Sequence, residues 1–225
     1  MLIHGFCSDY ALNWVGSRWQ AALTESGRRV IGLDCRGHGH SEKPHDPAAY
    51  DRTEMAADVV RLLDHLGLEK ADLVGYSMGG RIALEAALDH PRRVGRVVLG
   101  GVGRWVSREG PRHPEPTARR LRGDTSVDDP MATMFYDFAA ARPINDLEAL
   151  ACCILGRQRA LGDDQLRAAT TPILVCTGDQ DPLARGGDEL AGALGDGRFV
   201  SIPGRNHMNA VPARKFKEAA LEFLA

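Results

Sequence analysis

Residues 71–80 read Ala-Asp-Leu-Val-Gly-Tyr-Ser-Met-Gly-Gly, and this stretch decides the fold. Its apolar start predicts a buried strand over Ala71–Gly75, and the residues after the serine predict a helix over Met78–Asp89. Glycines stand two residues before and two residues after Ser77, as in a Gly-x-Ser-x-Gly elbow. Small residues there let strand and helix approach closely, while the serine adopts a strained backbone above the sheet edge. The stretch therefore predicts Ser77 as a nucleophile, and the alternative is a serine that only caps a helix.

Short apolar runs alternate with helix-length segments along most of the chain, which is typical of βαβ units around a parallel sheet. Strands covered by helices on both faces read as continuous apolar runs, and these do. The predicted strands are Leu2–His4, Val30–Leu33, Ala71–Gly75, Val94–Leu99, Ile173–Thr177 and Phe199–Ile202. The predicted helices are Thr53–Leu66, Met78–Asp89, Asp188–Leu194 and Ala213–Leu224. The predicted fold class is α/β, a mostly parallel sheet with helices on both faces.

The segment 104–169 interrupts this alternation, because it contains no convincing strand. A cluster of prolines at its start predicts an irregular entry, and helices are expected over Met131–Ala141 and Asn145–Leu161. A structureless loop of this length is unusual inside a compact domain. We therefore interpret the segment as a small helical lid inserted into a core made of residues 1–103 and 170–225.

One face of the first lid helix is apolar, because its large side chains recur at helical spacing. Such a stripe usually packs in an interior, and the alternative is the roof of a pocket over a site. The side chains expected to contact a substrate are Tyr76, Trp105, Met131, Met134, Phe135 and Phe138. Trp14 is expected beside Tyr76 at the pocket entrance.

A serine hydroxyl needs a general base to act as a nucleophile at neutral pH, and that base needs an orienting carboxylate. Of the eight histidines, only His207 lies between the last predicted strand and the final helix. Two carboxylates, Asp179 and Asp181, follow the strand that ends near Thr177. The order Ser, Asp, His along the chain is the one expected for a sheet with this elbow. Either aspartate could orient His207.

Together these features resemble the α/β-hydrolase superfamily, in its serine esterase, lactonase and haloperoxidase-like branch. Besides the elbow, the matching motifs are His-Gly-Phe at 4–6, Asp-Cys-Arg-Gly-His-Gly-His-Ser at 34–41 and Gly-Asp-Gln-Asp at 178–181. The resemblance implies a catalytic triad of Ser77, Asp181 and His207. In the family pattern the acid is the third residue after the glycine, which favours Asp181 and leaves Asp179 to cap the loop.

The resemblance also implies an oxyanion hole formed by the backbone amides of Phe6 and Met78, with His4 in a structural role. Because so few residues precede His4, the first two strands of the family are expected to be absent. The strand Val30–Leu33 would then lie at an open sheet edge, which predicts self-association into a homo-oligomer.

Composition excludes several classes of partner. The 225 residues include 28 basic and 30 acidic side chains, a net charge of −2, so we expect no binding to nucleic acid or to a membrane surface. No apolar run reaches the ~18 residues of a membrane span, and no signal peptide is recognisable. The five cysteines are odd in number and form no Cys-x-x-Cys pair, which predicts free thiols and a cytoplasmic location. The two histidines at 38 and 40 are too few for a metal site, so neither metal nor cofactor is expected.

The sequence thus predicts a serine hydrolase that cleaves small carboxylic esters or lactones through an acyl-enzyme on Ser77. His207 would act first as general base and then as general acid, with Asp181 orienting its imidazole. Two alternatives stay open: a C–C bond hydrolase or perhydrolase of the same fold, and a non-catalytic protein of this fold that binds a small ligand. The complete set of serine, aspartate and histidine argues against the second alternative.

Overall fold

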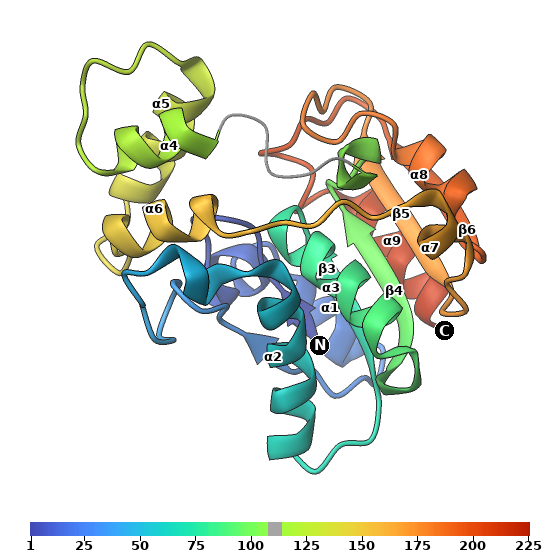
Figure 1. Ribbon diagram of the computed structural model, residues 1–225. Helices are drawn as coiled ribbons and strands as arrows, with labels where there is room; N and C mark the ends of the chain where they lie inside the picture. Colours follow the sequence, from blue (N-terminus) through green and yellow to red (C-terminus); the bar gives the residue numbers. More distant parts are fainter. Residues whose placement is uncertain (108–113) are drawn as a thin grey trace.

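The computed structural model describes residues 1–107 and 114–225 (Figure 1). Six strands form one sheet in the order β2-β1-β3-β4-β5-β6, and every neighbouring pair is parallel. The strands are β1 (Leu2–Ile3), β2 (Gly32–Leu33), β3 (Ala71–Tyr76), β4 (Val94–Gly100), β5 (Ile173–Gly178) and β6 (Gly197–Ile202). The predicted α/β fold is confirmed.

The helices are α1 (Trp19–Glu25), α2 (Arg52–His65), α3 (Met78–Asp89), α4 (Pro114–Leu121), α5 (Pro130–Ala140), α6 (Leu147–Leu155), α7 (Asp163–Arg167), α8 (Gly187–Ala193) and α9 (Arg214–Leu224). Helices α2, α3 and α8 cover one face of the sheet, and α1 and α9 cover the other (Figure 1). No helix in the described part of the chain is long and apolar enough to cross a membrane.

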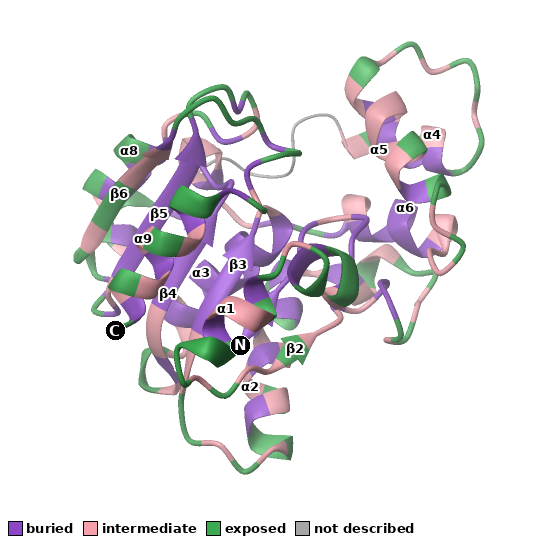
Figure 2. Cartoon of the chain, turned by 180° about the vertical axis from the view of Figure 1, so that it is seen from behind, coloured by how far each residue is buried: buried purple, intermediate pink, exposed green. Residues whose placement is uncertain are grey.

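Two hydrophobic cores lie on opposite faces of the sheet, because side chains alternate along each strand. Leu73 of β3 packs with α2, α3 and α8, whereas its neighbour Val74 packs with α1 and α9. Residues 173–176 of β5 alternate in the same way. Figure 2 shows the central strands β3, β4 and β5 as mostly buried, in agreement with their continuous apolar sequences.

A third, smaller core joins α4, α5 and α6 to the loop after β1. It includes Ala118, Ala139, Leu150 and Cys7. These three helices lie to one side of the sheet, beyond its carboxyl-terminal edge (Figure 1). They belong to the segment 104–169, which the sequence predicts to be helical.

Several expected boundaries differ in the structure. The strand expected over Val30–Leu33 is reduced to β2, a two-residue strand at the sheet edge. Helix α4 begins at Pro114, where an irregular entry is expected, because a proline is tolerated in the first turn of a helix. The rest of that entry, residues 108–113, lies outside the described residues. Helix α6 ends at Leu155 because Gly156 leaves the helical conformation with a ψ of 141°. The short helices α1 and α7 were not expected.

Candidate active site

The nucleophile elbow is built from β3, α3 and one strained residue between them. Ser77 has a φ of 51° and a ψ of −112°, a conformation that non-glycine residues rarely adopt. Its amide donates a hydrogen bond of 2.7 Å to the carbonyl of Gly100. A Cβ on Gly75 would collide with the carbonyl of Gly79, and a Cβ on Gly79 would collide with the carbonyl of Ile3. The glycines of the motif are therefore required by close backbone approach.

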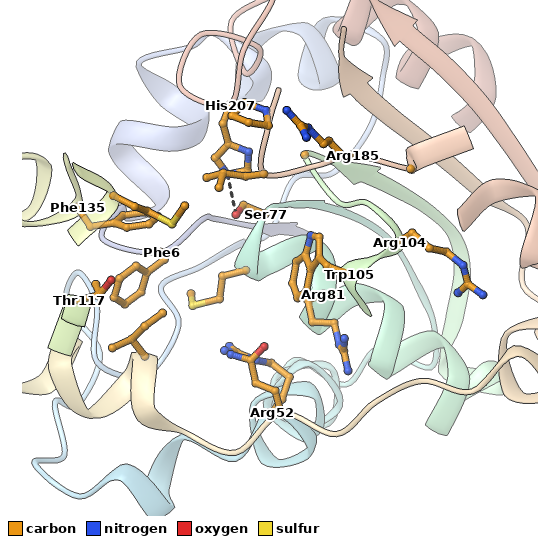
Figure 3. Close-up of a pocket in the computed structure, with 18 of the residues that line it drawn as sticks. Phe6, Arg52, Ser77, Arg81, Arg104, Trp105, Thr117, Phe135, Arg185 and His207 are labelled. Carbon is orange, nitrogen blue, oxygen red and sulfur yellow. Dashed lines mark hydrogen bonds between the residues drawn. The ribbon is translucent and has the colours of Figure 1, made fainter. Parts of the chain in front are cut away.

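Two further side chains complete a chain of hydrogen bonds from the serine. His207 lies with its Nε2 2.9 Å from Oγ of Ser77 (Figure 3). Its Nδ1 is 2.8 Å from Oδ2 of Asp181. The carboxylate of Asp181 is fully buried, and the imidazole is 10% exposed. The loops after β3, β5 and β6 deliver these residues, because the carboxyl ends of parallel strands meet at one edge of the sheet. The structure thus brings together the three predicted residues.

The contacts of the two candidate aspartates distinguish their roles. Asp181 has its Oδ1 within hydrogen-bond distance of the amides of Leu183, at 2.9 Å, and Ala184, at 3.1 Å. Asp179 instead accepts a hydrogen bond of 2.8 Å from the amide of Gly204 and joins the loops after β5 and β6. The aspartate in contact with His207 is therefore Asp181, and Asp179 has the loop-capping contact expected of it.

The loop after β1 lies against Ser77. A Cβ built on Gly5 would stand 3.7 Å from Cβ of Ser77, so the adjoining amide of Phe6 is close to the serine. His4, which is fully buried, holds this loop: its Nδ1 donates to the carbonyl of Gly5 at 2.8 Å, and its Nε2 accepts from the amide of Cys35 at 2.9 Å. The structural role expected of His4 agrees with these contacts.

A second buried histidine extends the support of that loop. The ring of His38 lies 5.1 Å from that of His4, and its Nε2 accepts from the amide of Cys7 at 3.2 Å. Burial lowers the pKa of both imidazoles, that of His38 to about 3, with the neighbouring His4 as a lesser cause. Both rings are therefore neutral at pH 7, as an accepting Nε2 requires. Within residues 1–107 and 114–225, no group of three or more metal-binding side chains is present.

A cavity of about 570 Å³ opens in front of Ser77 (Figure 3). Among the residues expected to contact a substrate, Trp105, Met131 and Phe135 line it. Met131 and Phe135 are one helical turn apart on α5, and only this part of the predicted stripe faces the cavity. Phe6 and Met78 also line this cavity, which contains Ser77.

The other expected contact residues do not line this cavity. Met134 and Phe138 lie further round α5, and Phe138 packs in the small core with α4 and α6. Trp14 is fully buried against Trp19 on the opposite face of the sheet. Tyr76 points to that same face, because it follows Gly75 in the alternation of β3. The prediction that these four side chains line the pocket or its entrance was therefore wrong.

Sequence reasoning missed the polar part of the cavity wall. Its lining includes Arg52, Arg81, Arg104, Arg185, Gln158 and Glu189. Arg81 lies one helical turn after Ser77, a spacing that could have indicated it. The remaining residues come from segments far apart in the chain, and no local pattern places them together.

The comparisons with known proteins agree with this geometry. Residues 1–142 match the family model of the alpha/beta hydrolase fold. The chain is 32% identical to RutD, a candidate carbamate hydrolase of Variovorax paradoxus, over 92% of this chain and 86% of that protein. It is 45% identical to a 2-hydroxymuconate semialdehyde hydrolase of Pseudomonas sp. over 45% of this chain, a match that spans 35% of that enzyme's length.

A solved structure extends the likeness to nearly the whole chain. The enol-lactonase from Burkholderia xenovorans superposes with a TM-score of 0.78 at 26% identity, covering 99% of this chain and 89% of that one. The match to the family model, the relative aligned over most of its length and the parallel sheet with its serine elbow all lead to one assignment. The chain belongs to the alpha/beta hydrolase fold family.

Proposed function

We propose that this protein is a serine hydrolase that cleaves small carboxylic esters or lactones through an acyl-enzyme on Ser77. The observation that carries the proposal is the pair of hydrogen bonds that links Ser77 to His207 and His207 to Asp181, at 2.9 and 2.8 Å. The likeness to an enol-lactonase supports a lactone or ester as substrate.

The first half of the reaction follows from these contacts. His207 accepts the hydroxyl proton of Ser77 through Nε2, and the serine oxygen attacks the carbonyl carbon of the substrate. Asp181 accepts the Nδ1 proton in a hydrogen bond and stabilises the imidazolium that forms. The imidazolium then protonates the leaving oxygen, and an acyl-enzyme results. In the second half, His207 activates a water molecule that hydrolyses this ester.

The negative oxygen of the tetrahedral intermediate needs hydrogen-bond donors. We assign this role to the backbone amides of Phe6 and Met78, which flank Ser77 in the loop after β1 and at the start of α3. Each such donor contributes about 2.7–4 kcal/mol of transition-state stabilisation in comparable enzymes. The positive end of the α3 dipole acts in the same direction.

The cavity indicates a small substrate. Its volume of about 570 Å³ suits a modest acyl group, and its apolar wall includes Trp105, Met131 and Phe135. We assign the segment 104–169 as a lid, because α5 contributes to this wall from outside the sheet.

A fluorophosphonate probe followed by mass spectrometry tests the proposal directly. We expect one adduct on Ser77 in the folded protein and none in the Ser77→Ala variant. Folded protein that stays unlabelled and hydrolyses no member of a panel of p-nitrophenyl esters and lactones would overturn the proposal. The relative rates over that panel would also distinguish esterase from lactonase activity.

A further inference from the structure

Arg52 is a buried cation in the wall of the cavity. It is the first residue of α2 and is only 3% exposed. Its Nη1 donates to Sδ of Met55 at 3.2 Å, and its Nε is buried with no hydrogen-bond partner among residues 1–107 and 114–225. Among the residues that the structure describes, no carboxylate oxygen lies within 4 Å of this guanidinium. The guanidinium of Arg52 therefore brings a positive charge to the cavity wall. Not all of its N–H groups have an acceptor among the described residues.

Two neighbouring arginines already have carboxylate partners. Arg81 forms a buried ion pair with Glu85, with 2.6 Å between Nε and Oε1. Arg159 pairs with the same glutamate at 3.0 Å and with Asp89 at 2.6 Å. Two cations and two carboxylates thus balance, and the charge of Arg52 is left over.

An unmatched guanidinium is unfavourable in a protein interior. It stays protonated at every physiological pH, so the cost of its burial is not relieved by loss of the proton. Buried charges are normally paired, and planar guanidinium groups favour carboxylates, which they bind through two parallel hydrogen bonds. The open side of Arg52 is the cavity, so its partner is expected to arrive with a ligand.

The position of Arg52 indicates which part of the substrate carries that partner. The leaving-group oxygen has to lie next to Nε2 of His207, because it receives its proton there. Figure 3 shows His207 and Arg52 on opposite sides of Ser77. The acyl group, which becomes attached to Ser77, therefore extends towards Arg52. Gln158, which is also buried, lines the same cavity and supplies a further polar group.

From this arrangement we infer that Arg52 binds a carboxylate at the far end of the acyl group, and that the substrates are monoesters of short dicarboxylic acids or lactones that bear a carboxylate. This inference rests on the proposed function, since it places the scissile carbonyl at Ser77. Hydrolysis consumes one water molecule, breaks the acyl C–O bond and releases a dicarboxylate, with an alcohol from the monoesters. No other reactant is needed.

Binding to the Ser77→Ala protein tests the inference without turnover. Monoethyl adipate and ethyl hexanoate form a matched pair, because their acyl chains have the same length and only the first carries a carboxylate. We expect calorimetry to show roughly tenfold to hundredfold tighter binding of monoethyl adipate, the range for a hydrogen bond to a charged group. Equal affinity for the two esters would overturn the inference.

Substitutions then assign the preference to Arg52. In the Ser77→Ala background we expect Arg52→Leu to abolish the preference and Arg52→Lys to retain part of it, because a single positive charge remains. Arg185→Leu is the matched control: Arg185 also lines the cavity but is exposed, so solvent screens its charge and the preference should change less than about twofold. A preference that survives Arg52→Leu, or that falls equally in Arg185→Leu, would contradict the assignment.

The same pair of esters separates this inference from the proposed function. In the protein with Ser77 intact, the ratio of kcat/KM for the two esters should fall in Arg52→Leu, mainly through the KM of monoethyl adipate. An enzyme that is labelled at Ser77 but shows no preference would overturn the inference and leave the proposed function standing. Circular dichroism melts check the fold of each variant, and Arg52→Lys provides a second substitution should Arg52→Leu misfold.

Discussion

The phenolic hydroxyl of Tyr76 donates a hydrogen bond of 2.6 Å to the backbone carbonyl of His207, a residue 131 positions further along the chain. Tyr76 directly precedes Ser77, so this contact ties the elbow to the loop that carries the imidazole. Burial raises the pKa of Tyr76 well above its usual value, which keeps the hydroxyl protonated as a donor. Tyr76 is therefore a positioning residue behind the site.

Tyr76→Phe removes this hydrogen bond and leaves the ring in place. The buried carbonyl of His207 then loses its partner, at a cost of about 1–3 kcal/mol, and the imidazole is less well held. We expect kcat for a p-nitrophenyl ester to fall about tenfold with a smaller change in KM. Tyr136→Phe, on α5, is the control and should leave both values near those of the wild type. Unchanged kinetics in Tyr76→Phe would refute the positioning role.

Asp181→Asn tests which carboxylate orients the histidine. The amide that replaces the carboxylate favours the wrong tautomer of His207 and gives no charge stabilisation to the imidazolium. A loss of about 10⁴-fold in kcat is expected from the equivalent change in comparable enzymes. Asp179→Asn should cost far less, because the carboxylate of Asp179 accepts from the amide of Gly204, whereas it is Asp181 that contacts His207. Steady-state rates of both variants decide the matter, and the opposite ranking would move the triad to Asp179.

The buried pair His4 and His38 predicts acid sensitivity. Their pKa values are lowered in the folded protein, that of His38 to about 3, whereas unfolded histidine titrates near 6.5. The contribution of these two neutral imidazoles to the unfolding free energy is complete above about pH 6.5. It is lost as the pH falls below that value, because the two histidines then bind protons only in the unfolded chain. Each histidine removes up to about 1.4 kcal/mol of unfolding free energy per pH unit.

Urea unfolding between pH 7.5 and 5.5 measures this slope above the range in which most carboxylates titrate. His38→Gln keeps a neutral acceptor and donor at that position but removes one titrating group. The unfolding free energy of this variant should therefore change less with pH than that of the wild type, by the contribution of one histidine. A stability that stays constant over this range in the wild type would contradict the prediction.

An ion pair connects the helices of the segment 104–169 to the loop after β1. Arg142, just after α5, contacts Asp9 through Nη2, and the side chain of Asp9 is only 4% exposed. Asn145 adds a hydrogen bond of 3.3 Å to the carbonyl of Cys7. Since Phe6 directly precedes Cys7, these contacts hold the amide that we assign to the oxyanion hole.

Arg142→Met should therefore lower activity without altering Ser77 or His207. We expect kcat and the rate of fluorophosphonate labelling to fall together by about threefold to tenfold, because the loop that carries Phe6 is less well held. Arg122→Met is a matched control, since its ion pair with Glu148 lies within the same helical segment but is about 40% exposed on both sides. Equal effects of the two substitutions would argue against a specific link to Phe6.

Much of this architecture follows from local patterns. The strands β3, β4 and β5 match their predicted ranges closely, because strands buried on both faces require continuous apolar runs. The serine elbow is equally local, since two glycines within five residues provide the close approach of strand and helix. Boundaries were less predictable where tertiary contacts end an element. A Cβ on Gly156, for example, would collide with the carbonyl of Tyr50.

The sequence by itself determined the parallel sheet and the elbow at Ser77, because short-range sterics and hydrophobic periodicity are properties of neighbouring residues. It left Asp179 and Asp181 as alternatives, and the contact of His207 with Asp181 appears only in the tertiary structure. Only the tertiary structure decided that Tyr76 supports the histidine and that Trp14 lies in the opposite core, since both depend on which face of the sheet a side chain meets. The unmatched charge of Arg52 belongs to this second group. Whether a cation is paired depends on carboxylates delivered by distant segments, and here those segments bring Glu85 and Asp89 to other arginines.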